Sequence, residues 1–84
     1  MHTTTTTYDL TARVTLYRND RDELLGTVTS FPTDGGRRYY VAEVRDYDGD
    51  AAPGKYLGLC AGVFDAEDSA VAAVIERART YGAL

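Results

Sequence analysis

The hydrophobic pattern of the chain changes its period at Asp65. Before this residue, apolar side chains recur at every second position within several short segments, as they do in strands that are buried on one face. After it, they recur three and four positions apart, which is typical of a helix with one apolar stripe. The sequence therefore predicts an α+β domain in which an antiparallel sheet is followed by one C-terminal α-helix packed on one of its faces.

Four segments have the composition of strands, and turn residues separate them. They are rich in the β-branched and aromatic residues that suit a pleated sheet, and they span residues 8–17, 24–31, 38–47 and 56–61. Between them lie a polar turn at 18–22, a Pro and Gly turn at 32–36, and a loop with Gly and Pro at 48–54. This succession predicts a four-stranded antiparallel meander.

One face of each strand is expected to meet the helix. In segment 8–17 the apolar even positions are the candidates, namely Leu10, Ala12, Val14 and Leu16. In segment 38–47 they are Tyr40, Ala42 and Val44. Gly62 is expected to mark a bulge where the chain leaves the sheet.

The predicted helix spans residues 66–81. Asp65 is the expected N-cap, and Gly82 is the expected C-terminal stop. The apolar stripe is formed by Val71, Val74, Ile75 and Ala78. Because one stripe covers one face of a sheet, the other face is expected to be uncovered.

Length and composition limit the class of protein. A chain of 84 residues has room for one domain, which spans 1–84, and its polar residues 1–7 are expected to form a flexible tail. The net charge of −4 disfavours non-specific attraction to nucleic acid. Cys60 is the only cysteine, so no intrachain disulfide forms, and no apolar stretch is long enough to span a membrane. We expect a cytoplasmic protein.

Candidate chemical sites are weak. The acidic loop 46–50 resembles the start of a calcium loop, but the glycine and the glutamate that such a loop needs further on are Ala51 and Leu57 here. Cys60 has only one histidine, His2, as a possible base, and that residue lies in the expected tail. We therefore expect no catalytic site, no metal and no cofactor, and hence no enzyme.

Tyrosine is the informative residue type, with seven in the chain and no tryptophan. If leucines and valines meet the helix, several tyrosines and arginines point to the opposite face of the sheet. Tyr and Arg are enriched at the centres of protein interfaces because they combine a large contact area with a polar tip. The predicted partner-binding residues are Arg13, Tyr17, Tyr39, Arg45, Tyr47 and Tyr56. The alternative is that these tyrosines only reflect the β-propensity of an outer sheet face.

These features favour a non-enzymatic protein-protein interaction module whose partner the sequence does not identify. Arginine outnumbers lysine eight to one, a bias that suggests a GC-rich source, and we hypothesise a phage- or mobile-element-encoded inhibitor or regulator of a host complex. The alternative is a small domain that binds single-stranded nucleic acid by stacking bases on the tyrosines. Two further alternatives remain. The same face pairs two copies of the chain in a homodimer, or the acidic surface of the protein imitates nucleic acid.

Overall fold

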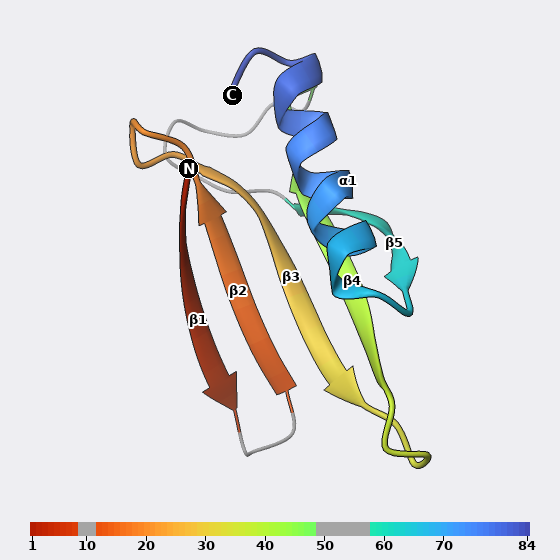
Figure 1. Ribbon diagram of the computed structural model, residues 1–84. Helices are drawn as coiled ribbons and strands as arrows, with labels where there is room; N and C mark the ends of the chain where they lie inside the picture. Colours follow the sequence, from red (N-terminus) through yellow and green to blue (C-terminus); the bar gives the residue numbers. More distant parts are fainter. Residues whose placement is uncertain (9–11, 49–57) are drawn as a thin grey trace.

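The computed structural model describes residues 1–8, 12–48 and 58–84. These residues form five strands and one helix: β1 (His2–Tyr8), β2 (Ala12–Arg18), β3 (Leu24–Pro32), β4 (Arg38–Arg45), β5 (Gly58–Phe64) and α1 (Glu67–Thr80). The strands make one antiparallel sheet in the order β1-β2-β3-β4-β5, and α1 lies against one face of it (Figure 1). The predicted α+β architecture, an antiparallel sheet with one C-terminal helix, is confirmed.

The predicted number of four strands is wrong, because residues 2–8 form the additional strand β1. It pairs with β2 along its whole length, from His2 opposite Arg18 to Tyr8 opposite Ala12. Threonine is β-branched and favours strands, although a run of threonines shows no apolar alternation. The sequence therefore predicted a polar tail. A strand can nevertheless form here, because an outer strand that α1 does not cover needs no apolar face.

The hydrophobic core lies between α1 and the sheet, mainly at β3 and β4, with Tyr17 of β2 in the core and Phe64 of β5 partly buried against it. As predicted, Ala42 and Val44 are buried on the helix side of β4, and Tyr40 packs against them. Among the residues that the structure describes, the buried apolar side chains are Tyr17, Leu25, Val28, Ala42, Val44, Ala70, Val74 and Ala78.

The predicted orientation of β2 is reversed. Tyr17 is only 5% exposed and belongs to the core on the helix side, so Val14 and Leu16 point to the opposite face. Tyr17 lies opposite Gly26 of β3 in the pairing of the two strands. Leu10, which was expected to face the helix, lies outside the described residues.

Helix α1 begins and ends within one residue of the predicted limits. The predicted N-cap is wrong: the capping position is Ala66, not Asp65, and no side chain caps the helix there. The predicted stop is confirmed, since Gly82 has a positive φ of 73°. Its N–H donates to Arg79 O at 3.1 Å and that of Ala83 to Ala78 O at 2.8 Å, which closes the helix with a Schellman motif.

The buried stripe of α1 consists of small residues. Val74 and Ala78 are buried as predicted, and Ala70 completes the stripe. Val71 is partly buried against the core, whereas Ile75 is half-buried on the flank of the helix. Alanine at two of the three buried positions lets the helix lie close to the sheet.

The outer strand β5 contains the predicted irregularity. Its pairing register with β4 shifts between Ala42 and Glu43, and Gly62 has a φ of 147° at this point. The expected start of this strand, at 56–57, lies outside the described residues. Within the described ranges, no helix has the length and apolar character required to cross a membrane.

Candidate functional site

The sheet face away from α1, here called the open face, carries a continuous row of β-branched side chains. Pairing registers place one residue from each strand in this row: Thr6, Val14, Thr29, Val41 and Val63. No element of the described chain packs over this face (Figure 1). The side chain row therefore crosses all five strands without a charged residue.

An aromatic pair lies beside this row. Phe31 of β3 and Tyr39 of β4 are cross-strand partners, and their rings stack with centroids 5.1 Å apart. Tyr39 is 36% exposed and Val63 is 63% exposed, which makes both available to a partner. The open face thus combines a strip of valines and threonines with an aromatic pair.

The structure divides the six predicted partner-binding residues among several places. Tyr39 lies on the open face, whereas the prediction that Tyr17 faces away from the helix is wrong because its ring is in the core. Arg13 is on the helix side, where it lines a small cleft together with Glu67. Arg45 and Tyr47 line a pocket at one end of the sheet. Tyr56 lies outside the described residues, and a binding role for any of the six remains a prediction.

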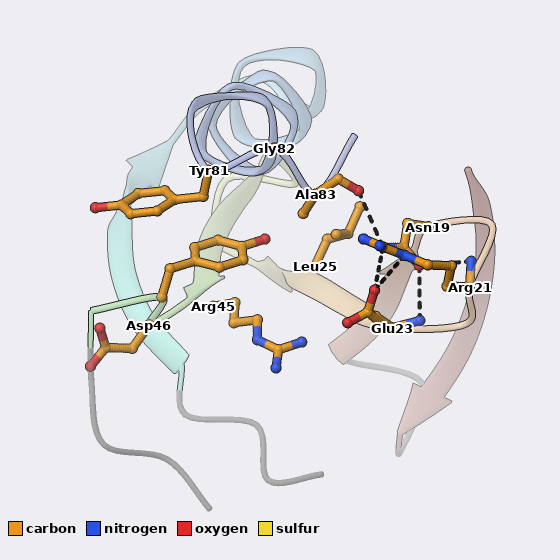
Figure 2. Close-up of a pocket in the computed structure, with 10 residues that line it drawn as sticks. Asn19, Arg21, Glu23, Leu25, Arg45, Asp46, Tyr81, Gly82 and Ala83 are labelled. Carbon is orange, nitrogen blue, oxygen red and sulfur yellow. Dashed lines mark hydrogen bonds and ion pairs between the residues drawn. The ribbon is translucent and has the colours of Figure 1, made fainter. Parts of the chain in front are cut away.

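The end pocket lies between the β2–β3 loop, the end of β4 and the residues after α1, and its volume is about 280 Å³ (Figure 2). It is predominantly polar and contains charges of both signs. Its lining residues are Asn19, Arg21, Glu23, Leu25, Arg45, Asp46, Tyr47, Tyr81, Gly82 and Ala83.

Two stacked tyrosines form one wall of the end pocket. The rings of Tyr47 and Tyr81 have centroids 4.7 Å apart and are nearly parallel, at 11°. The guanidinium carbon of Arg45 lies 5.8 Å from the Tyr47 ring, and that of Arg77 lies 4.7 Å from the Tyr81 ring. This stack joins the end of β4 to the C-terminus of α1.

The polar ends of these tyrosines differ in their surroundings. The Tyr81 hydroxyl donates a hydrogen bond to Asp48, which raises the pKa of Tyr81. The hydroxyl of Tyr47 is buried and has no hydrogen-bond partner in the described part of the chain. Burial raises the pKa of Tyr47 as well. Both side chains are therefore neutral at physiological pH, and their geometry is that of a structural clamp.

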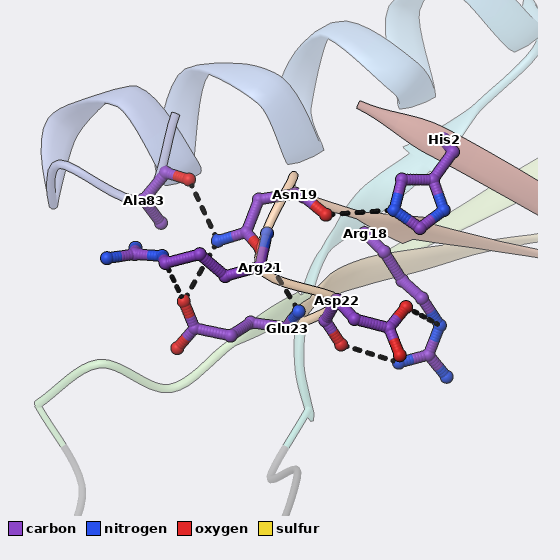
Figure 3. Close-up of polar contacts among 7 residues, drawn as sticks. All are labelled: His2, Arg18, Asn19, Arg21, Asp22, Glu23 and Ala83. Carbon is purple, nitrogen blue, oxygen red and sulfur yellow. Dashed lines mark hydrogen bonds and ion pairs between the residues drawn. The ribbon is translucent and has the colours of Figure 1, made fainter.

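Asn19 closes the opposite wall of the end pocket (Figures 2 and 3). Its side chain is almost completely buried and makes four hydrogen bonds: Oδ1 accepts from the N–H groups of Arg21 and Glu23, and Nδ2 donates to Glu23 Oε1 and Ala83 O. Its carbonyl also accepts a bond from His2 Nε2 at 3.0 Å (Figure 3). One residue thus connects β1, the β2–β3 loop and the C-terminal segment.

Glu23 is held as a carboxylate in this network. Its hydrogen bond from Asn19 and the nearby guanidinium of Arg21, 2.8 Å away, lower the pKa of Glu23. A carboxyl group in this state is a poor proton donor, so the arrangement does not resemble an acid-base pair. The network stabilises the loop.

Other chemistry-bearing residues are far apart in the fold. Cys60 lies on β5 and His2 on β1, at opposite edges of the sheet, so the histidine cannot activate the thiol. Across residues 1–8, 12–48 and 58–84, no group of three side chains is placed to hold a metal ion. Asp46 and Asp48 of the acidic loop are described, whereas Asp50 lies outside the described residues.

Comparison of the chain with protein-family models, with curated proteins and with solved structures found no match.

Proposed function

We propose that the protein is a non-enzymatic protein-binding module and that the open face is its binding surface. The observation that carries this proposal is the row of β-branched side chains that crosses all five strands of an uncovered sheet. The valines of this row and the neighbouring aromatic pair give the open face an uncharged, partly apolar surface, and exposed apolar surface that is contiguous marks interaction sites.

The aromatic pair supplies the second support for the proposal. Tyr39 offers a large ring that is already held by its stack on Phe31, so little rotational freedom is lost when a partner covers it. Glu43 of β4 lies on the same face next to this row and places a charged, exposed residue at its margin. A partly apolar centre with a polar margin is typical of protein interfaces.

The nucleic-acid alternative has less support from the geometry. It needs tyrosines and arginines on one face, but Tyr17 is buried and Arg13 lies on the helix side. The net charge of −4 also opposes binding to phosphates. We retain a protein as the partner class.

The finer role in this proposal is that of an inhibitor or regulator of a larger complex, encoded by a phage or mobile element. Such proteins act by occupying a surface rather than by chemistry, which agrees with a small domain that offers one flat apolar face. A cytoplasmic location is part of the proposal, since the only cysteine has an exposed thiol, which persists best in a reducing compartment.

The test uses two surface variants of equal charge change. Val63→Asp places a carboxylate on the open face, and Ala72→Asp places one on the exposed side of α1. A partner is first captured from the source organism, identified by mass spectrometry and purified, and its Kd is then measured by calorimetry. We expect Val63→Asp to raise the Kd by about tenfold or more and Ala72→Asp to leave it unchanged.

A folded Val63→Asp variant with the Kd of the parent protein would exclude the open face as the binding surface. Binding of the parent protein to a single-stranded oligonucleotide, with an affinity that falls steeply as salt rises, would favour the nucleic-acid alternative instead.

A further inference from the structure

Strand β1 is an edge strand without the usual protection against pairing. Residues 2–7 are all exposed, and β1 contains no Asp, Glu, Lys, Arg or Pro. Its register with β2 runs without a bulge, and no strand in the described part of the chain pairs with its outer edge (Figure 1). Natural proteins normally block such an edge with charge, Pro, a bulge or a covering element, because its free N–H and C=O groups can pair with another chain.

The other edge of the same sheet is protected. Strand β5 has a bulge in its pairing with β4, and Gly62 adopts a backbone conformation that interrupts regular extension. Helix α1 also packs against β5. The two edges therefore differ, and only β1 offers a straight, seven-residue edge of backbone groups.

We propose that β1 pairs with β1 of a second copy of the chain, antiparallel and around a two-fold axis, so that the two sheets become one continuous sheet. With the axis at Thr5, the pairing places Thr3 opposite Thr7 and Thr4 opposite Thr6 of the other copy. Every central pair is then threonine with threonine. A cross-strand pair of threonines already exists between β1 and β2, where Thr5 Oγ1 and Thr15 Oγ1 form a hydrogen bond of 2.9 Å.

A second copy fits this edge better than a foreign strand. A partner that adds a strand is selected through pockets or charges for alternate side chains, and a run of identical small side chains offers neither. The same run is complementary to itself, as a two-fold interface requires. The carboxylates that give the chain its net charge of −4 are absent from β1, so this edge avoids the repulsion between two acidic molecules.

This pairing goes beyond the proposed function, because it uses the outer backbone edge of β1, whereas the proposed binding surface uses side chains of the open face. A two-fold axis perpendicular to the sheet keeps both copies of α1 on one side and both open faces on the other. The dimer would therefore leave the open face available to a partner.

The experiment measures the molecular mass by sedimentation equilibrium over a range of protein concentrations. The parent chain should behave as a dimer that dissociates on dilution. The double variant Thr4→Lys with Thr6→Lys places lysines opposite lysines in the proposed pairing and should raise the dimer dissociation constant by about tenfold or more. Thr4→Glu with Thr6→Glu should act in the same way, and an equimolar mixture of the two variants should restore a dimer.

The matched control is Ser69→Lys with Ala72→Lys, which makes the same charge change at exposed positions of α1 and should leave the mass unchanged. A second experiment needs no variant. Amide hydrogen exchange is measured on the parent chain, and the protection of the β1 amides from exchange should rise with protein concentration. A parent chain that stays monomeric, a dimer that the β1 lysines leave intact, or protection of β1 that does not depend on concentration would overturn the proposal.

Discussion

Among single residues, Gly26 sets how closely α1 approaches the sheet. A Cβ atom at this position would lie 2.5 Å from the carbonyl oxygen of Glu43 and 2.8 Å from Cγ1 of Val74. Both distances are shorter than van der Waals contact allows. Val74 is completely buried, so it packs against the backbone of β3 where a larger residue would hold it away.

We expect Gly26→Ala to destabilise the protein by roughly 1–3 kcal/mol through overpacking. Replacing Val74 with Ala in the same chain should not restore stability, because the contact with the Glu43 backbone remains. Urea unfolding provides the measurement, and Gly35→Ala is the control, since nothing lies within 4 Å of a Cβ there. Equal stability of the Gly26 and Gly35 variants would contradict this account of the packing.

We expect Tyr17 to make the stability of the protein depend on pH in the alkaline range. Burial, with a smaller contribution from Glu67, raises the pKa of Tyr17 in the folded state. A raised pKa means that the folded state keeps its proton where the unfolded state loses it. The resulting stability is complete below the unfolded pKa of about 10 and is lost as pH rises through the folded pKa.

Tyr17→Phe keeps the ring and removes the titrating group. We therefore expect the Tm of this variant to fall less than that of the parent chain between about pH 9 and pH 11. Parallel curves for the two proteins would show that Tyr17 does not contribute to the alkaline transition.

The orientation of Tyr17 is a feature of the fold that the sequence alone did not predict. The alternation of apolar and polar residues correctly predicted that β2 is a strand. The prediction of its buried face was wrong, because Tyr17 faces the helix while Val14 and Leu16 face away. The face of an alternating strand that is buried depends on the elements that pack against it, and the sequence of a single strand does not contain that information. For this reason the prediction is correct for Tyr39 of β4, which lies on the open face, and wrong for Tyr17 of β2, which lies in the core.

At the scale of elements, the β2–β3 loop is held by Asn19. The sequence identified a polar turn at this point, but it did not show that one side chain would join the loop to the segment after α1 through Ala83 O. Asp22, with a φ of 62°, completes the turn in a conformation that a non-glycine residue adopts only when neighbouring contacts support it.

Asn19→Ala removes four side-chain hydrogen bonds and should cost roughly 2–4 kcal/mol of stability. Asn19→Asp keeps both bonds from backbone N–H groups but places a carboxylate against Glu23 Oε1 and Ala83 O. It should therefore also be destabilising, and more so at neutral pH than at low pH, where the carboxyl groups are protonated. Thermal unfolding at two pH values measures this. A pH-independent difference between Asn19→Asp and the parent chain would contradict the proposed contacts.

The sequence predicted the types of the secondary-structure elements better than the number of strands. Helix α1 and strands β3 and β4 were expected near their observed limits, because each has a clear period and strong turn residues at its ends. Strand β1 was missed, since threonines in a strand outside the core have no alternation to detect. The open-face row was missed for a related reason: it is formed by pairing across five strands, and it joins residues that are far apart in the sequence.

For the whole molecule, the important feature is that α1 covers only part of the sheet. The helix packs mainly on β3, β4 and β5, whereas the β1–β2 hairpin extends beyond it (Figure 1). Buried apolar side chains are accordingly concentrated in β3, β4 and α1, and residues 2–7 of β1 are all exposed. Both proposed interactions use surfaces that the helix leaves uncovered, namely the open face in one case and the outer edge of β1 in the other.

This unequal coverage predicts a gradient of local stability across the sheet. Amides of β3 and β4 are flanked by strands on both sides and covered by α1, so they should exchange only through global unfolding. Amides of β1 are held by one neighbouring strand and no core, so they should open at a lower free energy. The measurement is native-state hydrogen exchange in rising denaturant on the Thr4→Lys with Thr6→Lys variant, in which pairing between copies is removed. If β1 and β4 in that variant opened with the same free energy, the sheet would unfold as one unit, and the β1–β2 hairpin would depend on the core far more than its contacts indicate.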